Sequence, residues 1–198
     1  MRDNHNRDRP SLLTFAFLFE GSLAVIGALL AWLAEVPLAK LLWPADITLA
    51  LARGLMGTLL MMPLLVILLH ARWRPIARLR RLVSRFVRQL FGDAPIWQLA
   101  LIALVAGLGE EVLFRGAIQP LAIRATGPLV GLVITSLLFG LAHAASPTYF
   151  WLAAGVGLYL GAIAMATGEI LSAVIIHSLY DFVALTCLSH RYFVRNRH

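Results

Sequence analysis

Long apolar runs alternate with short polar connections along this chain. Crossing a hydrocarbon core of about 30 Å takes about 20 helical residues, and lipid leaves free backbone groups unsatisfied, so such runs must be helices. The pattern therefore predicts an all-α fold, a polytopic transmembrane helical bundle of about six spans. The predicted spans are residues 11–34, 47–69, 94–119, 128–145, 149–167 and 170–189.

Glycine and proline mark the ends of several predicted spans. Gly127 precedes Pro128, and Ser146 precedes Pro147. Proline suits the first position of a helix, where its missing N–H is not needed, and serine is a favoured N-cap. The pair Gly168 and Glu169 predicts another break.

Residues 76–91 have a different pattern from the spans on either side. Apolar side chains recur there at helical spacing, at Ile76, Leu79, Leu82, Val83, Phe86 and Leu90. The opposite side carries Arg78, Arg81, Arg85 and Arg88. This predicts one interfacial amphipathic helix, whose Arg72–Arg88 segment binds anionic lipid headgroups. A solvated helix packed on protein is the alternative.

The composition supports a membrane protein. Apolar residues make up 60% and charged residues 14% of the 198 residues, against about 45–50% and about 25% in soluble domains. The net charge of +7 does not indicate nucleic acid, because the basic residues lie between hydrophobic segments. A single cysteine, Cys187, excludes a disulfide within the chain.

The arginines predict the orientation, since basic loops resist translocation. Three lie before the first span, seven from Arg72 to Arg88, and three after the last span. The loops predicted on the other side of the membrane contain only two basic residues, Lys40 and Arg124. We therefore expect an integral, multi-pass protein with N- and C-termini in the cytoplasm, located in the bacterial inner membrane.

Ionisable side chains gather in the second half of the chain. Each such side chain near the bilayer centre costs at least ~2.5–3.5 kcal/mol and so needs a partner or a function. The third, fourth and sixth predicted spans carry Glu110, Glu111, Arg115, His143, His177 and Asp181. Three separate helices could thus contribute to one polar site.

The spacing predicts which of these side chains pair. Glu111 and Arg115 are four residues apart and share a helix face, as do His177 and Asp181. Glu110 is left without a dedicated cation, which suits a general base. The small residues Gly107, Gly109, Gly116 and Gly140 would let the helices approach closely.

Such a cluster could hydrolyse a peptide bond. Glu110 would take a proton from water, and His143 would orient that water. His177 and Asp181 would support the oxyanion or position the scissile carbonyl. Arg115 would hold Glu111 in place.

The same residues resemble the three motifs of the CPBP family of intramembrane proteases. This family includes CAAX prenyl endopeptidases and Abi-type bacteriocin-processing or immunity proteins. The motif EExxxR matches Glu110, Glu111 and Arg115, FxxxH matches Phe139 and His143, and HxxxN/D matches His177 and Asp181. The resemblance covers residues 94–185 and implies a glutamate-dependent intramembrane endopeptidase, with Phe139 in a supporting position.

The resemblance also suggests a division of the chain. Residues 1–75 form an N-terminal two-span region, residues 76–93 an amphipathic helix and linker on the cytoplasmic side, and residues 94–198 the catalytic domain. The expected substrate is a membrane-associated peptide or protein. The family favours processing of a peptide or protein tail.

The role of Asp181 stays open, because an ionised aspartate cannot donate a hydrogen bond to an oxyanion. It could be protonated, orient His177 or bind a metal. Zinc held by His143, His177 and a carboxylate is an alternative to the metal-free mechanism, since catalytic zinc commonly has three protein ligands.

The predicted spans place Glu110 and His143 at different depths in the membrane. Glu110 lies ~20 Å along its predicted helix, at ~1.5 Å per residue, whereas His143 lies near the end of the next span. Tilt, a longer fourth helix or a partly re-entrant 144–149 connection would bring them level.

Two other functions remain open. Intramembrane Glu, His and Asp also form the proton relays of transporters, although no repeated halves are evident here. The same pocket could also serve a non-catalytic immunity or assembly factor that binds a membrane partner. Glu20, in the first span, has no evident partner in the sequence.

Overall fold

The computed structural model describes residues 9–92 and 94–195, and these residues form helices without a strand. Its elements are α1 (Arg9–Leu33), α2 (Leu38–Leu42), α3 (Ile47–His70), α4 (Arg74–Phe91), α5 (Ile96–Leu113), the π-helix η1 (Phe114–Ile118), α6 (Gln119–Thr126), α7 (Pro128–Ala142), α8 (Pro147–Thr167) and α9 (Leu171–Arg195). The all-α polytopic bundle is confirmed.

Among the described residues, five helical segments are long and apolar enough to cross a membrane. They are Leu13–Leu33, Ile47–His70, Ile96–Thr126, Pro147–Thr167 and Leu171–Ser189. The fourth predicted span is the shorter α7, which ends at Ala142 instead of residue 145. At 1.5 Å per residue, its 15 residues extend roughly 22 Å, less than a full crossing.

The third span is longer than the sequence predicted. It passes through η1 and continues beyond residue 119 along α6 to Thr126. The π-helix contains Arg115 and Gly116, within the first predicted motif. Such π-helical turns are rare and frequently lie at functional sites.

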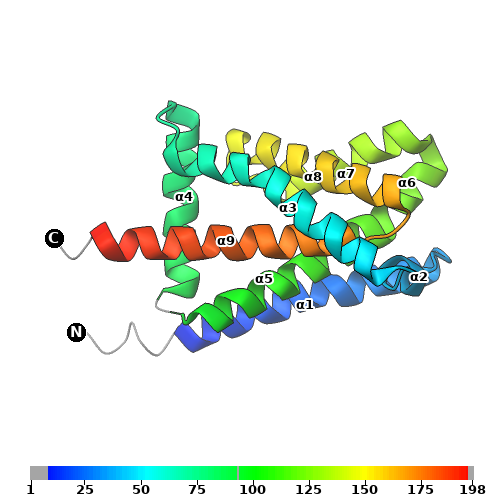
Figure 1. Cartoon of the computed structure of the whole chain (residues 1–198), viewed down its shortest axis with the longest axis horizontal. Helices are drawn as coiled ribbons and strands as arrows, with labels where there is room; N and C mark the ends of the chain where they lie inside the picture. Colours follow the sequence, from blue (N-terminus) through cyan, green and yellow to red (C-terminus); the bar gives the residue numbers. More distant parts are fainter. Residues whose placement is uncertain (1–8, 93, 196–198) are drawn as a thin grey trace.

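Helix α4 crosses one end of the bundle nearly perpendicular to the long helices (Figure 1). Its buried face consists of Ile76, Leu79, Val87 and Phe91. Of the predicted apolar face, Ile76 and Leu79 are buried against the bundle, whereas Leu82 and Phe86 are 37% and 58% exposed. Exposed apolar side chains are compatible with an interfacial helix, whose apolar face contacts lipid.

Arg80 connects α4 to the end of α3. Its Nη1 donates hydrogen bonds to the carbonyl oxygens of Leu69 and Ala71, at 3.0 and 3.2 Å. Unpaired carbonyls at a helix C-terminus carry partial negative charge, so a cation there is stabilising. This arginine therefore fixes the corner between the second span and the amphipathic helix.

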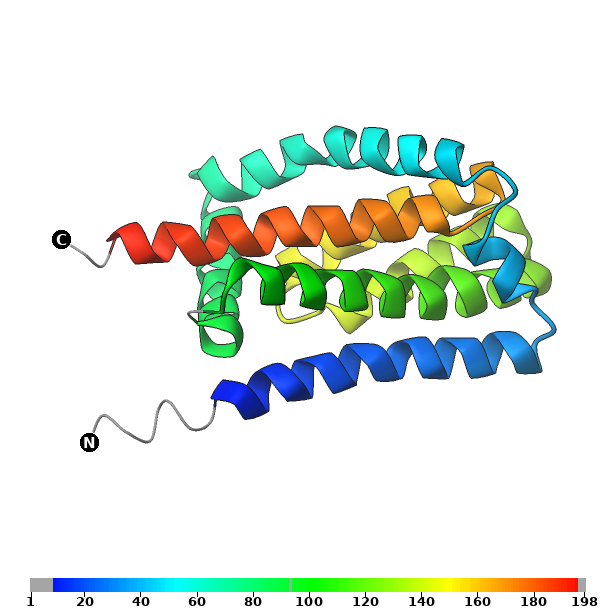
Figure 2. The same ribbon diagram turned by 60° about the horizontal axis from the view of Figure 1, so that its bottom comes forward.

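The two ends of the bundle differ in what they contain. The start of α1, the end of α9 and the whole of α4 lie at one end (Figures 1 and 2). The opposite end holds α2 and the connection from α6 to α7 (Figures 1 and 2). The Arg72–Arg88 segment and the two described helix termini therefore share one side, which agrees with an even number of crossings.

Glycines allow several helix backbones to touch. A Cβ at Gly27 in α1 would lie 2.6 Å from the backbone of Leu113 in α5. At Gly107 a Cβ would overlap Ser178 in α9, and at Gly140 it would lie 2.8 Å from the Phe150 carbonyl oxygen in α8. Close approach is thus confirmed along α5 and α7, as small residues permit in membrane helix packing.

Candidate active site

The predicted polar residues converge between α5, η1, α7 and α9. Glu111 and Arg115 have fully buried side chains, with relative exposures of 0% for both. The exposed side-chain fraction then rises to 12% for Glu110, 21% for His143 and 36% for Asp181. The site is therefore closed at the Glu111–Arg115 pair and opens beside His143 and Asp181.

Glu111 and Arg115 form the buried ion pair that their spacing predicted. Arg115 Nη1 donates to Glu111 Oε1 at 2.8 Å, and Nη2 donates to the Gly157 carbonyl oxygen in α8 at 3.0 Å. Because a buried ion pair must offset its desolvation with further hydrogen bonds, the Gly157 carbonyl is an important third partner. The guanidinium thereby links α5, η1 and α8.

His177 joins this pair from α9. Its Nδ1 lies 2.9 Å from Glu111 Oε1, within hydrogen-bond distance. A carboxylate only accepts hydrogen bonds, so Nδ1 carries the proton and donates it. The sequence had paired His177 with Asp181 alone and had missed this contact across helices.

Asp181 lies on the other side of the same imidazole. Its Oδ2 is 3.5 Å from His177 Nε2. His177 is thus placed between two carboxyl groups, Glu111 and Asp181. This arrangement supports an orienting role for Asp181, which was one of the three alternatives left by the sequence.

Glu110 faces His143, which follows the last residue of α7. Glu110 Oε2 lies 3.7 Å from His143 Nε2, too far for a direct hydrogen bond. The other ring nitrogen, Nδ1, lies 2.9 Å from the Phe139 carbonyl oxygen, which fixes the orientation of the ring. The predicted depth mismatch is resolved because α7 is short and its end lies beside Glu110.

Phe139 packs at the centre of these groups. Its ring stacks on His143 with centroids 4.7 Å apart and an interplanar angle of 29°. The Arg115 guanidinium carbon lies 4.5 Å from the centroid of the same ring, a distance typical of cation–π contacts. Phe139 therefore holds His143 and Arg115 at a fixed separation.

Three carboxyl oxygens around the site are buried and have no hydrogen-bond partner in the described part of the chain. They are Oε2 of Glu20, Glu110 and Glu111. Because most buried polar atoms in proteins are hydrogen-bonded, these oxygens are acceptors available to a water molecule or to a substrate. Glu110 in particular has an acceptor directed at the space beside His143.

The described side chains do not fit the three-ligand zinc site considered from the sequence. His143 and His177 direct their Nε2 atoms toward different carboxyl groups, Glu110 and Asp181. Within residues 9–92 and 94–195, no group of three or more His, Cys, Asp or Glu side chains is arranged to hold a metal ion.

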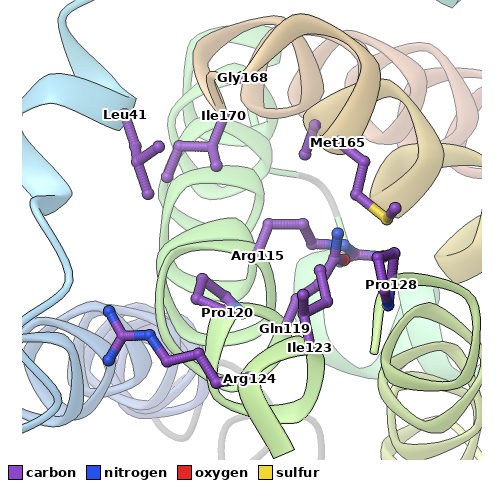
Figure 3. Close-up of a pocket in the computed structure, with 11 residues that line it drawn as sticks. Leu41, Arg115, Gln119, Pro120, Ile123, Arg124, Pro128, Met165, Gly168 and Ile170 are labelled. Atoms are coloured by element: carbon purple, nitrogen blue, oxygen red, sulfur yellow. The ribbon is translucent and has the colours of Figure 1, made fainter. Parts of the chain in front are cut away.

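A separate cavity of about 410 Å³ lies on the far side of Arg115 (Figure 3). It is bounded by α2, α6, the start of α7 and the segment from Ala164 to Ile170. Its lining is mostly apolar and includes Gln119, but none of Glu110, His143, His177 and Asp181. This cavity therefore meets the predicted site only at Arg115.

Three further residues join the site without a signal in the motifs. The Gly157 carbonyl binds Arg115, and the Tyr149 ring lies 5.5 Å from the His143 ring. In α1, the backbone carbonyl of Glu20 lies against Gly109, next to Glu110, and one carboxyl oxygen of Glu20 is buried. Of these three residues, only Glu20 had a signal in the sequence, because it is a glutamate without an evident partner inside an apolar span.

Comparison with known proteins agrees with the motif geometry. Residues 92–183 match the family described as type II CAAX prenyl endopeptidase Rce1-like. No curated protein and no solved structure matches the chain. The matched segment contains all three motifs and excludes α1 and α3. The match over residues 92–183, just under half of the chain, therefore confirms the resemblance to the CPBP family of proteases and agrees with a membrane protein that has several apolar helices.

Proposed function

We propose that this protein is an intramembrane endopeptidase in which Glu110 activates a water molecule held with His143. The observation that carries the proposal is the unpartnered Glu110 Oε2, which lies 3.7 Å from His143 Nε2. This separation leaves room for one water molecule at about 2.8 Å from both Glu110 Oε2 and His143 Nε2, which is hydrogen-bond distance. Glu110 takes the proton of this water as its oxygen attacks the scissile carbonyl.

The neighbouring groups support the developing charge. His177 donates one hydrogen bond to Glu111, and its Nε2 faces Asp181. When both ring nitrogens carry protons, Nε2 donates toward the oxyanion while Asp181 orients the ring. Arg115 holds Glu111, and so holds His177, through contacts that do not involve substrate.

The substrate reaches this site from the end of the bundle that carries α4. Asp181, the most exposed of the site residues, is one helical turn nearer that end than His177, because α9 runs toward it (Figure 1). We place this end on the cytoplasmic side, where the arginines of α4 contact anionic headgroups. A membrane-associated peptide or protein tail is the substrate class that fits this entry.

The test uses the purified protein in liposomes with a library of lipid-anchored peptides. Fragments released into solution are identified by mass spectrometry. We expect Glu110→Gln to lower the cleavage rate by about 10²–10⁴-fold, the usual contribution of a general base. The matched control is Glu35→Gln, because Glu35 is exposed beyond the end of α1.

Cleavage that persists in Glu110→Gln contradicts the proposal. Proton flux across the same liposomes, lost in Glu110→Gln without any peptide cleavage, identifies the transporter instead. Tight binding of a membrane partner that is unaffected by Glu110→Gln identifies a non-catalytic factor.

A further inference from the structure

Gln119 is a buried polar side chain that none of the three motifs includes. It is the first residue of α6, four residues after Arg115, and only 3% of it is exposed. Its Nε2 donates a hydrogen bond to the Gly161 carbonyl oxygen in α8 at 3.0 Å, whereas its Oε1 has no partner among the described residues. An amide that is buried with its oxygen unpaired is not explained by stability alone.

The bond of Gln119 repeats a contact that Arg115 makes one helical turn earlier. Arg115 Nη2 donates to the Gly157 carbonyl oxygen, also in α8, at 3.0 Å. Gly161 follows Gly157 by four residues, just as Gln119 follows Arg115. Because residues four apart lie on the same face of a helix, two side chains from η1 and α6 bind two successive turns of α8.

Glycine at position 161 leaves room for the amide of Gln119. A Cβ there would lie 2.6 Å from Gln119 Oε1, too close for the amide to keep its place. On the other side, Gln119 and Arg115 both border the cavity of about 410 Å³ (Figure 3). Because that side is open, no close packing presses the amide onto α8 from there. The position of the amide on α8 therefore depends on its bond to the Gly161 carbonyl.

This contact acts on the site through Arg115. The guanidinium binds Glu111 at 2.8 Å, and Glu111 in turn accepts the hydrogen bond of His177. The Gly157 carbonyl orients the guanidinium as long as α8 keeps its register along η1 and α6. We propose that Gln119 is a positioning residue, which holds α8 in that register and so keeps Arg115 and His177 in place. This role rests on the proposed function, because it concerns groups that support the oxyanion.

Two substitutions remove the contact from opposite sides. Gln119→Met keeps the length of the side chain without a donor, and Gly161→Ala places a methyl group where the amide lies. We expect each to lower kcat for lipid-anchored peptides on the order of tenfold, since small misplacements of catalytic groups are costly. KM should stay within about threefold, because Gln119 acts on the reaction and not on substrate binding. The Met variant should unfold at nearly the wild-type temperature, because hydrogen bonds between membrane helices contribute little to stability.

Two control variants match these substitutions. Gly155→Ala adds a methyl group to the same helix, α8, where it meets nothing within 4 Å. Thr135→Val removes a buried hydroxyl that donates within its own helix, α7, to the Gly131 carbonyl oxygen. Neither control should change kcat. When Gln119→Met and Gly161→Ala are combined, kcat should fall no further than in the single variants, because both remove the same contact.

Solid-state NMR spectra of the protein in liposomes, labelled at its histidine nitrogens, test the positioning role without substrate. The ring signal of His177 is assigned by its loss in His177→Gln. It should shift or broaden in Gln119→Met and Gly161→Ala and stay unchanged in Gly155→Ala.

Three results overturn the inference: an unchanged His177 signal, losses of kcat that multiply in the double variant, or losses of activity that follow losses of stability in both single variants. If the signal changes as expected but even the wild type cleaves no peptide, the proposed function fails. The positioning of Arg115 and His177 by Gln119 then still stands.

Discussion

His177 illustrates how one side chain can serve two partners in this site. Its Nδ1 is within hydrogen-bond distance of Glu111, and its Nε2 faces Asp181. The first contact belongs to the buried Glu111–Arg115 network, whereas the second lies at the open edge. The imidazole therefore connects the buried part of the site to its more exposed edge at Asp181.

Asp181 should tolerate replacement by its amide. Asp181→Asn keeps an oxygen that accepts from His177 and adds a donor for an oxyanion, so we expect the cleavage rate to stay within about threefold. Asp181→Ala leaves His177 without this support, and we expect a loss on the order of tenfold. Cleavage rates of the two variants in liposomes check this expectation. A severe loss in Asp181→Asn would show that the negative charge itself is needed.

Two irregular elements bring the site together. Helix α7 ends at Ala142, short of a full crossing, so His143 lies beside Glu110 instead of near the end of the bundle. The π-helical turn from Phe114 to Ile118 contains Arg115, which reaches both Glu111 and Gly157. A regular six-span bundle would not align these groups at one depth.

The packing of α1 on α5 should be sensitive to a single methyl group. A Cβ at Gly27 would lie 2.6 Å from the Leu113 backbone, whereas one at Gly21 meets nothing within 4 Å. We expect Gly27→Ala to destabilise the protein by about 1–3 kcal/mol, as overpacking usually does, and to lower activity by shifting α1 away from Glu110.

Gly21→Ala is the matched control and should change neither property. Unfolding in detergent micelles and cleavage in liposomes measure the two effects. If the two variants were equally stable, α1 could move away from α5 without a loss of stability.

The charge distribution over the whole bundle indicates how it lies in a membrane. The Arg72–Arg88 segment and α4 occupy the end that also holds the start of α1 and the end of α9 (Figure 1). Lys40 and Arg124 belong to α2 and α6 at the opposite end. This asymmetry supports cytoplasmic termini through the positive-inside rule.

Thiol labelling tests this orientation. In a Cys187→Ala background, which has no other cysteine, Lys40→Cys and Arg85→Cys each place one thiol at an exposed position. A membrane-impermeant reagent added to intact cells should label the variant at position 40. It should reach position 85 only after the membrane is opened. The reverse pattern would place α4 outside the cell.

The sequence alone predicted most of the secondary structure and most of the site. Apolar runs must become helices in lipid, so the spans were recognisable, and helical spacing predicted the pairing of Glu111 with Arg115. The three motifs also named the residues that converge. These features are local, because they depend on spacing within one helix.

The tertiary structure decided what depends on contacts between helices. The length of α7, the π-turn at Arg115 and the contact of His177 with Glu111 all arise where one helix packs on another. The same holds for Glu20, which the sequence left without a partner and whose backbone carbonyl lies against Gly109, next to Glu110. A chain in lipid forms its helices from local hydrogen bonds, whereas their relative depth follows from side-chain packing between segments far apart in sequence.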